Sequence, residues 1–368
     1  MDNKKKKIAF YIGSLGKGGA ERVIVNLAEY FYSQNYEVYV VTKLQEENEY
    51  SLNSDITRVI ADITKEEETK SRFGNLCARI RKLRHIWKTI KPDVIVSFIR
   101  KNNVMAIVSS RFLHIPVVVS VRSDPGRELQ GRSMKTLSMF LFHFAKGIVL
   151  QTNQAKEFFS RSLQKKSVIL PNSINPNFLK AEKVTEKEKE IITVGRIDKN
   201  KNQRMLIEVF SEIASAYPDW CVRLYGDGEE VPSLKKMVKE KELEKQIFFM
   251  GQVSDVAEKV GRASIFVLPS KCEGMPNALI EAMTLGTAVI STDCPCGGPA
   301  DLIQNGKNGI LIAVDDKDAL KKALLELIND EKYRQELAQS ATRIIEKLHP
   351  DIVNKQWEEY LGSILRKC

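Results

Sequence analysis

Two glutamates in the second half of the chain have a spacing that could serve a ligand. Glu273 lies in the loop after the apolar run 265–268, and Glu281 follows eight residues later in a segment with helical spacing. A loop that leads into a helix offers free backbone N–H groups and the positive end of the helix dipole, which suit a phosphate. Carboxylates in the loop and on the second helical turn can accept hydrogen bonds from hydroxyl groups of one ligand. A charged helix surface would give the same spacing, but Gly274 and the apolar run at 287–292 favour a ligand site.

Two cations follow another apolar run. Residues 191–194 lead into Gly195 and Arg196, and Lys201 comes five residues after that arginine. A guanidinium grips phosphate through a planar fork, whereas an ammonium acts as a compact point charge. Arg196 and Lys201 together are therefore predicted to hold a diphosphate. The alternative interpretation is a solvated basic turn.

Glycines recur where the predicted strands end. Gly226 and Gly228 follow the run 222–225, and Gly18 and Gly19 come shortly after a first apolar run. Glycine allows a ligand or another backbone segment to approach closely. One such loop is a weak signal, but four strand-end loops in this order, including those at 195 and 274, are a much stronger one.

The apolar runs alternate with segments of helical periodicity, which predicts parallel sheets buried on both faces. In the first half we expect strands at 8–12, 36–42, 94–98, 117–121, 147–151 and 168–170, with helices near 20–34, 75–90, 103–112 and 128–144. In the second half we expect strands at 191–194, 222–225, 247–250, 265–268, 288–291 and 309–312. The predicted fold class is α/β, with two doubly wound, Rossmann-like domains whose ligand sites lie at the carboxyl ends of strands.

The length of 368 residues fits two domains of ordinary size. The mixed-charge stretch 180–190 has little to bury and is predicted to be the linker. We therefore expect an N-terminal domain over 1–180 and a C-terminal domain over 181–349. Residues 350–368 are expected to form a last helix that crosses back to the N-terminal domain.

Targeting and metal signals are weak. The apolar run at 8–12 is short and lacks a cleavage site, and no apolar stretch approaches the roughly 20 residues of a membrane-spanning helix, so we expect a cytoplasmic protein. The six cysteines lack zinc-site spacing. Asp316 and Asp318 resemble a D-x-D metal motif, but they precede a predicted helix and are better explained as capping residues. We expect no metal and no cofactor.

The net charge of +10 is unevenly distributed. Residues 1–180 contain 30 Lys and Arg against 16 Asp and Glu, whereas 181–368 contain 27 against 31. This asymmetry predicts an anionic partner for the N-terminal half, such as membrane lipid, a lipid diphosphate or nucleic acid. Nucleic acid ranks low because no recognition module is present. The basic segment 79–88 and its apolar side fit a helix on anionic lipid, although a helix packed on a sheet has the same pattern.

Taken together, these motifs resemble those of the retaining glycosyltransferases of family 4, which have the GT-B architecture of two Rossmann-like domains facing a central cleft. The resemblance spans nearly the whole chain. It rests on Gly18-Gly19-Ala20-Glu21, Gly195-Arg196 with Lys201, Gly226-Asp227-Gly228, Phe249-Met250-Gly251, the pair Glu273 and Glu281, and Asn308-Gly309-Ile310-Leu311.

The resemblance implies roles for these residues. Arg196 and Lys201 would bind the donor diphosphate and stabilise its charge as it leaves, and Glu273 would contact the hydroxyls of the donor sugar. Glu281 would hold the ribose hydroxyls. The remaining donor-binding residues would be Gly18, Gly19, Gly195, Gly228, Gly274, Met275, Asn277, Ala278 and Leu279.

The implied reaction moves a sugar, with retention and without a metal, from a nucleotide sugar that is typically a UDP-sugar. The acceptor would be lipid-linked or a saccharide, in the assembly of a bacterial capsule, exopolysaccharide or O-antigen. The enzyme would then sit on the inner face of the membrane as a peripheral protein. A sugar-nucleotide epimerase or a phosphorylase of the same fold remains an alternative, and a basic nucleic-acid-binding protein ranks below both.

One position departs from the family pattern. Many relatives have a histidine beside the reacting centre after the strand that matches 117–121, where this chain has Arg122, Ser123 and Asp124. Arg122 and Asp124 are expected to hold the donor or the acceptor there, and a purely structural loop is an equal alternative.

Overall fold

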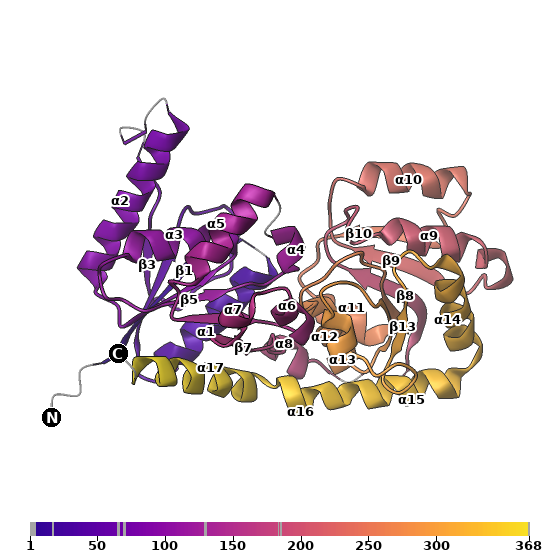
Figure 1. The fold of residues 1–368 in the computed structure, drawn as a ribbon. Coiled ribbons are helices and arrows are strands. Elements are labelled where there is room, and N and C mark those ends of the chain that lie inside the picture. The colour runs from indigo at the N-terminus through magenta and orange to yellow at the C-terminus, as the bar shows by residue number, and fades with distance from the viewer. Residues whose placement is uncertain are drawn as a thin grey trace. The chain divides into compact units, whose positions relative to one another are not determined.

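The computed structural model describes residues 5–16, 18–64, 67–68, 71–128, 131–182, 184 and 186–366, with the side chains of 132–134 left out. The chain divides into two compact units. The first comprises the described residues up to Pro171 together with those from Asp351 onward, and the second is Asn172–Pro350. Residues 172–180 therefore pack with the second unit, and the last helix packs with the first (Figure 1).

The first unit is built on a seven-stranded sheet with the order β3-β2-β1-β4-β5-β6-β7, in which all paired strands are parallel. Parallel strands need crossover connections, and helices supply them here. The strands are β1 (Lys7–Ile12), β2 (Glu37–Thr42), β3 (Thr57–Ile60), β4 (Val94–Phe98), β5 (Val117–Ser120), β6 (Gly147–Leu150) and β7 (Ser167–Ile169).

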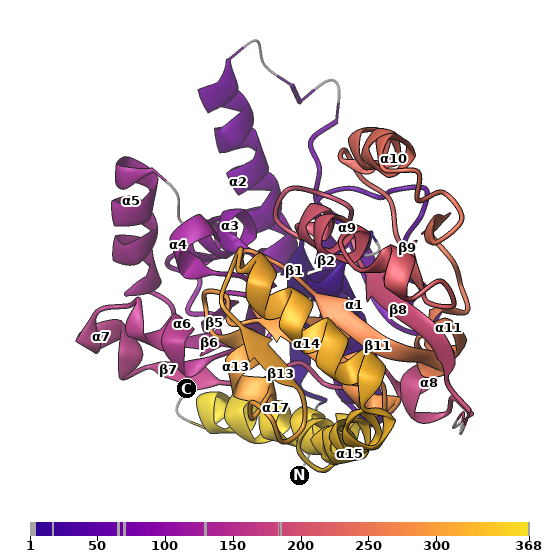
Figure 2. The ribbon, with the colours of Figure 1, turned by 90° about the vertical axis from the view of Figure 1, so that its right-hand side faces the viewer.

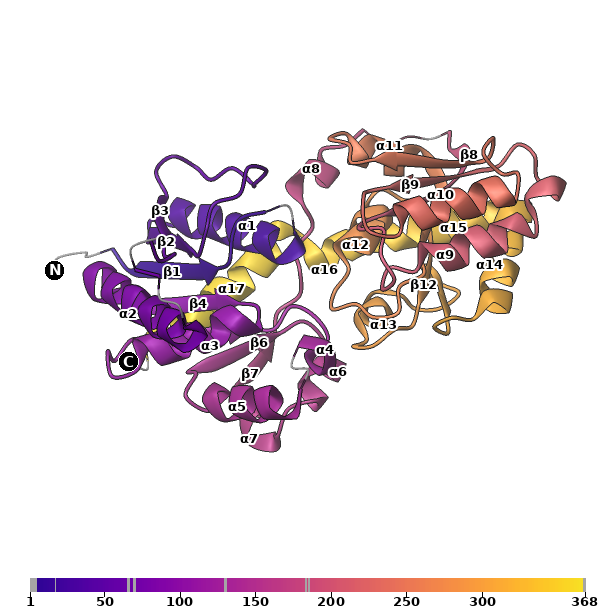
Figure 3. The same cartoon turned by 90° about the horizontal axis from the view of Figure 1, so that it is seen from above.

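Helices cover both faces of this sheet (Figures 1 and 3). They are α1 (Gly19–Ser33), α2 (Arg72–Ile90), α3 (Arg100–Ser110), α4 (Pro125–Glu128), α5 (Arg132–Phe142), α6 (Asn153–Glu157), α7 (Arg161–Gln164) and α17 (Pro350–Leu365). Alternate strand residues point to opposite faces. Tyr11 packs with Trp87 of α2, whereas Phe10 packs on Phe31 of α1 and Phe98 stacks on the fully buried Trp357 of α17.

The second unit repeats this plan with a six-stranded parallel sheet in the order β10-β9-β8-β11-β12-β13. Its strands are β8 (Glu188–Val194), β9 (Cys221–Tyr225), β10 (Ile247–Gly251), β11 (Ala263–Leu268), β12 (Ala288–Thr292) and β13 (Ile310–Ile312). Its helices are α8 (Pro176–Leu179), α9 (Gln203–Ser211), α10 (Val231–Glu240), α11 (Val256–Arg262), α12 (Asn277–Thr284), α13 (Gly298–Leu302), α14 (Lys317–Asn329), α15 (Glu331–Ala341) and α16 (Ile345–Leu348). One core packs α9, α10 and α14 against the sheet (Figure 2), while α11 and α12 also contact it.

Both sheets reverse their strand order beside the first strand of the unit. In the first unit β1 lies between β2 and β4, and in the second β8 lies between β9 and β11. Ligands of doubly wound sheets bind outside the carboxyl ends of strands at this switch point. The loops after β8 and β11 carry Arg196, Lys201 and Glu273, so the fold brings the predicted cations and carboxylate to one place.

The two Rossmann-like units confirm the predicted fold class, with two differences in detail. The edge strand β3 was not predicted, because its residues are only partly buried and give no clear apolar run. The expected linker 180–190 was wrong at its end, since β8 already begins at Glu188. Glu190 is buried there and pairs with Arg223 of the neighbouring strand. Among the described residues, no helix is long and apolar enough to cross a membrane.

Candidate donor site at the switch point of the second unit

The loop after β8 is shaped by one aspartate. The Oδ1 atom of Asp198 accepts hydrogen bonds from the backbone N–H groups of Asn200, at 3.0 Å, and Lys201, at 2.8 Å. This local bonding fixes a tight turn and begins the approach to α9. Arg196 projects from the same loop with 80% of its side chain exposed, and its Nε lies 3.5 Å from Asp198 Oδ2. The loop therefore presents one largely exposed cation, Arg196, and one fixed cation, Lys201.

The fixed cation is held by the predicted carboxylate. Lys201 Nζ lies 2.7 Å from Glu273 Oε1, and their side chains are only 19% and 11% exposed. Asn200 strengthens the same junction, because its Nδ2 donates to Cys272 O at 2.9 Å and its carbonyl accepts from Lys271 N at 2.7 Å. The loops after β8 and β11 are thus joined by the ion pair and by these two hydrogen bonds of Asn200.

The Glu273 loop is also tied to the loop after β12. Glu273 N donates to Pro295 O at 2.8 Å, and Cys296 N donates to Glu273 O at 3.0 Å. A Cβ atom on Gly298 would lie only 1.7 Å from Gly274 O. Glycine is therefore required at 298, since any side chain would push the carboxylate-bearing loop away.

Helix α12 begins directly after this loop. Pro276 precedes it and makes no side-chain cap, so the first N–H groups of the helix, which have no intrahelical partner, point toward the loop end. Leu279 and Glu281 are buried one turn further on. Asn172 braces the helix start, because its Nδ2 donates to Met275 O at 3.0 Å and to Asn277 Oδ1 at 2.8 Å. Together these groups can receive an anion at the helix end and hydroxyl groups at the carboxylates.

Glycines let the loops after β8 and β9 touch. Gly195 and Gly226 have φ of 143° and 133°, and a Cβ on Gly226 would lie 1.9 Å from Gly195 O. A Cβ on Gly228 would lie 2.2 Å from Ile197 O. The glycines after β9 thus have a packing role that is visible in the fold, and the donor-binding role expected for Gly228 stays a prediction.

The predicted residues of the first unit lie at the carboxyl ends of its own strands. Gly18 precedes α1 as its N-cap residue, and Gly19 is the first residue of that helix. Glu21, in the first turn, is partly buried, and this burial raises the pKa of its carboxyl. The structure therefore puts both glycines at a helix start beside the switch strand β1.

Arg122, which follows β5, lies over the Phe98 ring, with its guanidinium carbon 5.1 Å from the ring centroid. Burial lowers the pKa of Arg122 to about 9 and raises the pKa of Glu128. Glu128 accepts hydrogen bonds from Ser123 Oγ at 2.8 Å and from Arg100 N at 2.5 Å, and so links the loops after β4 and β5. Glu128 could not be recognised from the sequence, because its hydrogen-bond partners come from two separate loops.

Asp124 has a clear structural partner. Its Oδ1 accepts a hydrogen bond from Gly126 N at 2.9 Å, which forms the turn into α4. This contact accounts for an aspartate at this position without a ligand, and a role for Asp124 toward the acceptor stays a prediction.

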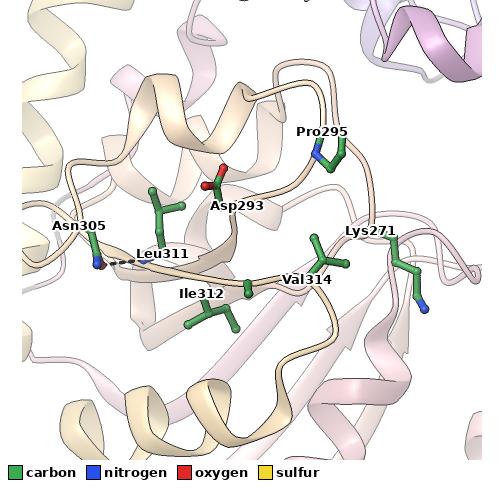
Figure 4. A pocket seen from close by; sticks show the side chains of 8 residues that line it. Lys271, Asp293, Pro295, Asn305, Leu311, Ile312 and Val314 are labelled. Atoms are coloured by element: carbon green, nitrogen blue, oxygen red, sulfur yellow. Dashed lines mark hydrogen bonds between the residues drawn. The ribbon is translucent and has the colours of Figure 1, made fainter. Parts of the chain in front are cut away.

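Two hollows open near the donor loops. One of about 770 Å³ lies at the carboxyl ends of β11, β12 and β13, and Figure 4 shows Lys271 and Asn305 on opposite sides of it. A second, of about 320 Å³, includes Asp198, Asn202 and Lys271 in its lining. Both volumes lie in the range of about 300 to 1,000 Å³ that is typical of small-molecule sites. The larger hollow lies beside the Glu273 loop, because Pro295 lines it and accepts the Glu273 N–H.

The aspartates near 316 have structural partners. Asp316 caps α14, with its Oδ1 accepting from Ala319 N at 2.9 Å, and Asp315 pairs with Lys271 at 2.9 Å. Asp316 is thus the helix cap that the sequence predicts. Within the described parts of the chain, no cluster of three His, Cys, Asp or Glu side chains is arranged to hold a metal ion.

Comparison with known proteins identifies the family of the chain. The family model described as Glycosyltransferase Family 4 matches residues 17–178, and the one described as Glycosyl transferases group 1 matches 175–344. The two matches follow each other along almost the whole chain, which therefore belongs to the family 4 glycosyltransferases.

Individual relatives are distant but match from end to end. The chain is 26% identical over 364 residues to an α-1,4-N-acetyl-D-galactosaminyltransferase of Campylobacter jejuni, whose name gives an undecaprenol diphosphate glycan as acceptor. That match covers 97% of this chain and 99% of the relative. The amylovoran biosynthesis glycosyltransferase AmsD of Erwinia amylovora is 23% identical, with 95% and 97% covered.

Solved structures share the fold. HepE of Anabaena, in complex with UDP, matches with a TM-score of 0.82 at 18% identity over 97% of this chain and all of that one. Sucrose-phosphate synthase of Thermosynechococcus elongatus matches with a TM-score of 0.84 at 16% identity, covering 99% of this chain and all of that one. The two-unit architecture is the GT-B fold.

The contact between Gly298 and Gly274 yields a prediction. Gly298→Ala should displace the loop that carries Glu273 and weaken binding of a sugar nucleotide by at least about tenfold, because the added methyl group meets a backbone carbonyl. Calorimetric titration measures the affinity. Gly261→Ala in α11 is the matched control, since a Cβ there meets nothing within 4 Å. Unchanged affinity in Gly298→Ala would show that this loop is not part of the site.

Proposed function

We propose that this enzyme transfers a sugar, with retention, from a UDP-sugar to a lipid-linked saccharide acceptor during assembly of a bacterial surface polysaccharide. The observation that carries the proposal is the Lys201–Glu273 pair beside the start of α12, at the switch point of the second sheet. The acceptor class rests on relatives whose names give undecaprenol-diphosphate-linked glycans or amylovoran. The donor class rests on the complexes of HepE with UDP and UDP-glucose.

In this proposal the second unit holds the donor. The diphosphate lies between Arg196, Lys201 and the first N–H groups of α12, while Glu281 binds the ribose and Glu273 the donor sugar. Backbone and side chains from Gly274 to Leu279, together with Gly195 and Gly228, line the nucleotide sugar. Arg196 is largely exposed beside Asp198, whereas Lys201 is already oriented by its ion pair. A pre-placed donor such as Lys201 stabilises the charge that develops on a leaving group by roughly 3 to 4 kcal/mol.

The first unit would bind the acceptor. Gly18 and Gly19 would approach the donor, and Arg122 and Asp124 would contact the acceptor or the reacting centre. The bond between the anomeric carbon and the diphosphate breaks while the acceptor hydroxyl adds to that carbon on the same face. The hydroxyl proton passes to the departing diphosphate oxygen, so the nucleoside diphosphate leaves and no protein nucleophile is required. We propose that the reaction also needs no metal, because the two cations and the helix end supply the positive charge.

Charge on the N-terminal half supports peripheral attachment to the anionic inner face of the membrane. The basic side of α2 is a poor candidate for the whole docking surface, because several of its cations have partners within the first unit. Arg79 lies 3.6 Å from Asp62, Lys82 lies 3.5 Å from Glu67, and Arg84 donates to Ser109 O and Arg111 O.

The proposal is tested most simply by turnover. Incubation with UDP-sugars and undecaprenol-diphosphate-linked saccharides should give a glycoside whose new bond keeps the anomeric configuration of the donor. Mass spectrometry and NMR of the product decide this. A product with inverted configuration, or an epimerised nucleotide sugar without a glycoside, would contradict the proposal.

Arg196→Ala and Lys201→Ala should each lower kcat by at least about a hundredfold with the fold intact, because both cations meet charge in the departing diphosphate. Steady-state kinetics and circular dichroism provide the measurement. Lys199→Ala is the matched control, since Lys199 is an exposed cation of the same loop with no assigned role. Near wild-type turnover in either variant would remove that residue from the reaction.

Glu281→Ala and Glu273→Ala should fail in different ways. Loss of Glu281 should weaken binding of UDP itself, because the carboxylate is assigned to the ribose. Loss of Glu273 should lower turnover more than UDP affinity, because its assigned contact is the sugar and the hydrogen bonds of Asn200 still join the two loops. Calorimetry with UDP and kinetics with the UDP-sugar separate the two. Equal UDP affinity in wild type and Glu281→Ala would refute the ribose assignment.

Chelation tests the metal-free mechanism. Treatment with EDTA should leave turnover unchanged, since the assigned charge comes from Arg196, Lys201 and the helix end. A loss of turnover that added Mn²⁺ restores would contradict this part of the proposal.

A further inference from the structure

Helix α5 is apolar on both of its sides. Phe142 and Ser138 are fully buried against the core of the first unit, where Met139 and Leu141 also pack. On the opposite side Leu137 and Phe140 are exposed, with Phe140 61% accessible, and Phe144 continues the stripe one turn later. The spacing 137, 140 and 144 places these side chains along one line. An exposed apolar stripe of this kind, on a helix whose other side is already packed, marks an interaction surface.

The exposed stripe continues into the end of α3. The Phe140 and Phe144 rings meet edge to face at 5.3 Å between centroids. The Arg111 guanidinium carbon lies 4.2 Å from the Phe144 centroid and 5.1 Å from that of Phe112, whose residue is 80% exposed. We refer to these five residues, Leu137, Phe140, Phe144, Arg111 and Phe112, as the aromatic–arginine patch. A hollow of about 220 Å³ opens beside Phe112 and Phe144 and is lined in part by Ile107, Ile115 and Val117.

The sequence around the patch carries mostly positive charge. The stretches 94–123 and 129–156 contain eight Lys and Arg and no Asp or Glu, whereas the nearest carboxylates in the sequence are Asp124, Glu128 and Glu157. Lys146 and His143, next to the patch, are exposed as well. An apolar surface with a mainly cationic surround matches an anionic bilayer, whose headgroups attract the cations while its acyl chains receive the rings.

We propose that the aromatic–arginine patch is the membrane-docking surface of this enzyme and that it inserts its phenyl rings into the interface of an anionic bilayer. The inference rests on the proposed function, because a lipid-linked acceptor requires a place on the membrane. A second copy of the chain is a poorer occupant, since a two-fold contact through this patch would bring like charges together. The patch contains none of the residues assigned to donor or acceptor, and it lies on the face of the sheet covered by α2, α3 and α5 (Figure 1).

The test uses a double variant that carries both Phe112→Ser and Phe140→Ser. Cosedimentation with vesicles of phosphatidylglycerol and phosphatidylcholine should show that the wild type binds. The double variant should bind at least about tenfold more weakly, because it lacks the two rings that would enter the bilayer. The matched control is Ile352→Ser with Met250→Ser, which removes two exposed apolar side chains outside the patch. Ile352 lies on α17, against the other face of the sheet. UDP binding should stay equal in all three proteins.

Insertion is distinguished from mere adsorption by Phe140→Trp. The three native tryptophans are buried and stay out of reach of the bilayer, so the change in emission relative to wild type should come from the tryptophan at 140, as a blue shift on anionic vesicles and quenching by brominated acyl chains. Equal vesicle binding by the Phe112→Ser, Phe140→Ser variant, or absence of quenching, would overturn the proposal. A wild-type dimer in sedimentation velocity that this variant loses would instead assign the patch to self-association. Turnover on a short-chain soluble acceptor without vesicle binding would reject the patch and leave the proposed function standing.

Discussion

The ion pair between Lys201 and Glu273 is the contact on which the arrangement of the candidate donor site depends, at the carboxyl ends of β8 and β11. The two residues are 72 positions apart, and they meet because β8 and β11 are neighbours in the sheet. Both side chains are largely shielded from water, where the attraction between unlike charges is stronger than on an open surface. Removing one partner would leave the other charge poorly solvated, so the pair constrains both loops at once.

Backbone contacts make this junction rigid. Gly226 touches the loop after β8, and Gly298 touches the loop that carries Glu273, at distances where no side chain fits. Asn200 and the hydrogen bonds at Glu273 add further links between three consecutive strand ends. A site built in this way holds its charges in place before a ligand arrives, which is the condition for electrostatic stabilisation without reorganisation. Arg196 is the exception, and its exposure fits a cation that closes on the ligand afterwards.

Much of the fold follows from patterns that are local in sequence. Continuous apolar runs identify nearly all strands, because parallel strands are buried on both faces. Asp316 was recognisable as a helix cap because a cap also depends on residues that are close in sequence. The edge strand β3 escaped this reasoning because its partial burial leaves no periodic signal. The sequence placed Glu190 in a linker, because its partner Arg223 is distant in sequence and comes close only when β8 and β9 pair.

The same distinction between local and distant residues holds for the candidate site. The loop-to-helix segment around Glu273 and Glu281 could be recognised by spacing, whereas most residues that hold the site loops in place could not. Asn172 lies about a hundred residues before the helix start that it braces, and Glu128 reaches back to Arg100 across a strand. Asp198 is the one support with a readable signal, since an aspartate two residues before Asn200 is typical of a side-chain-stabilised turn.

A crystal structure of the protein with an intact UDP-sugar would locate the donor. The diphosphate should lie within hydrogen-bonding distance of Arg196, Lys201 and the first N–H groups of α12, with the sugar hydroxyls on Glu273 and the ribose on Glu281. A diphosphate bound elsewhere, for instance only in the hollow between Lys271 and Asn305, would contradict this placement.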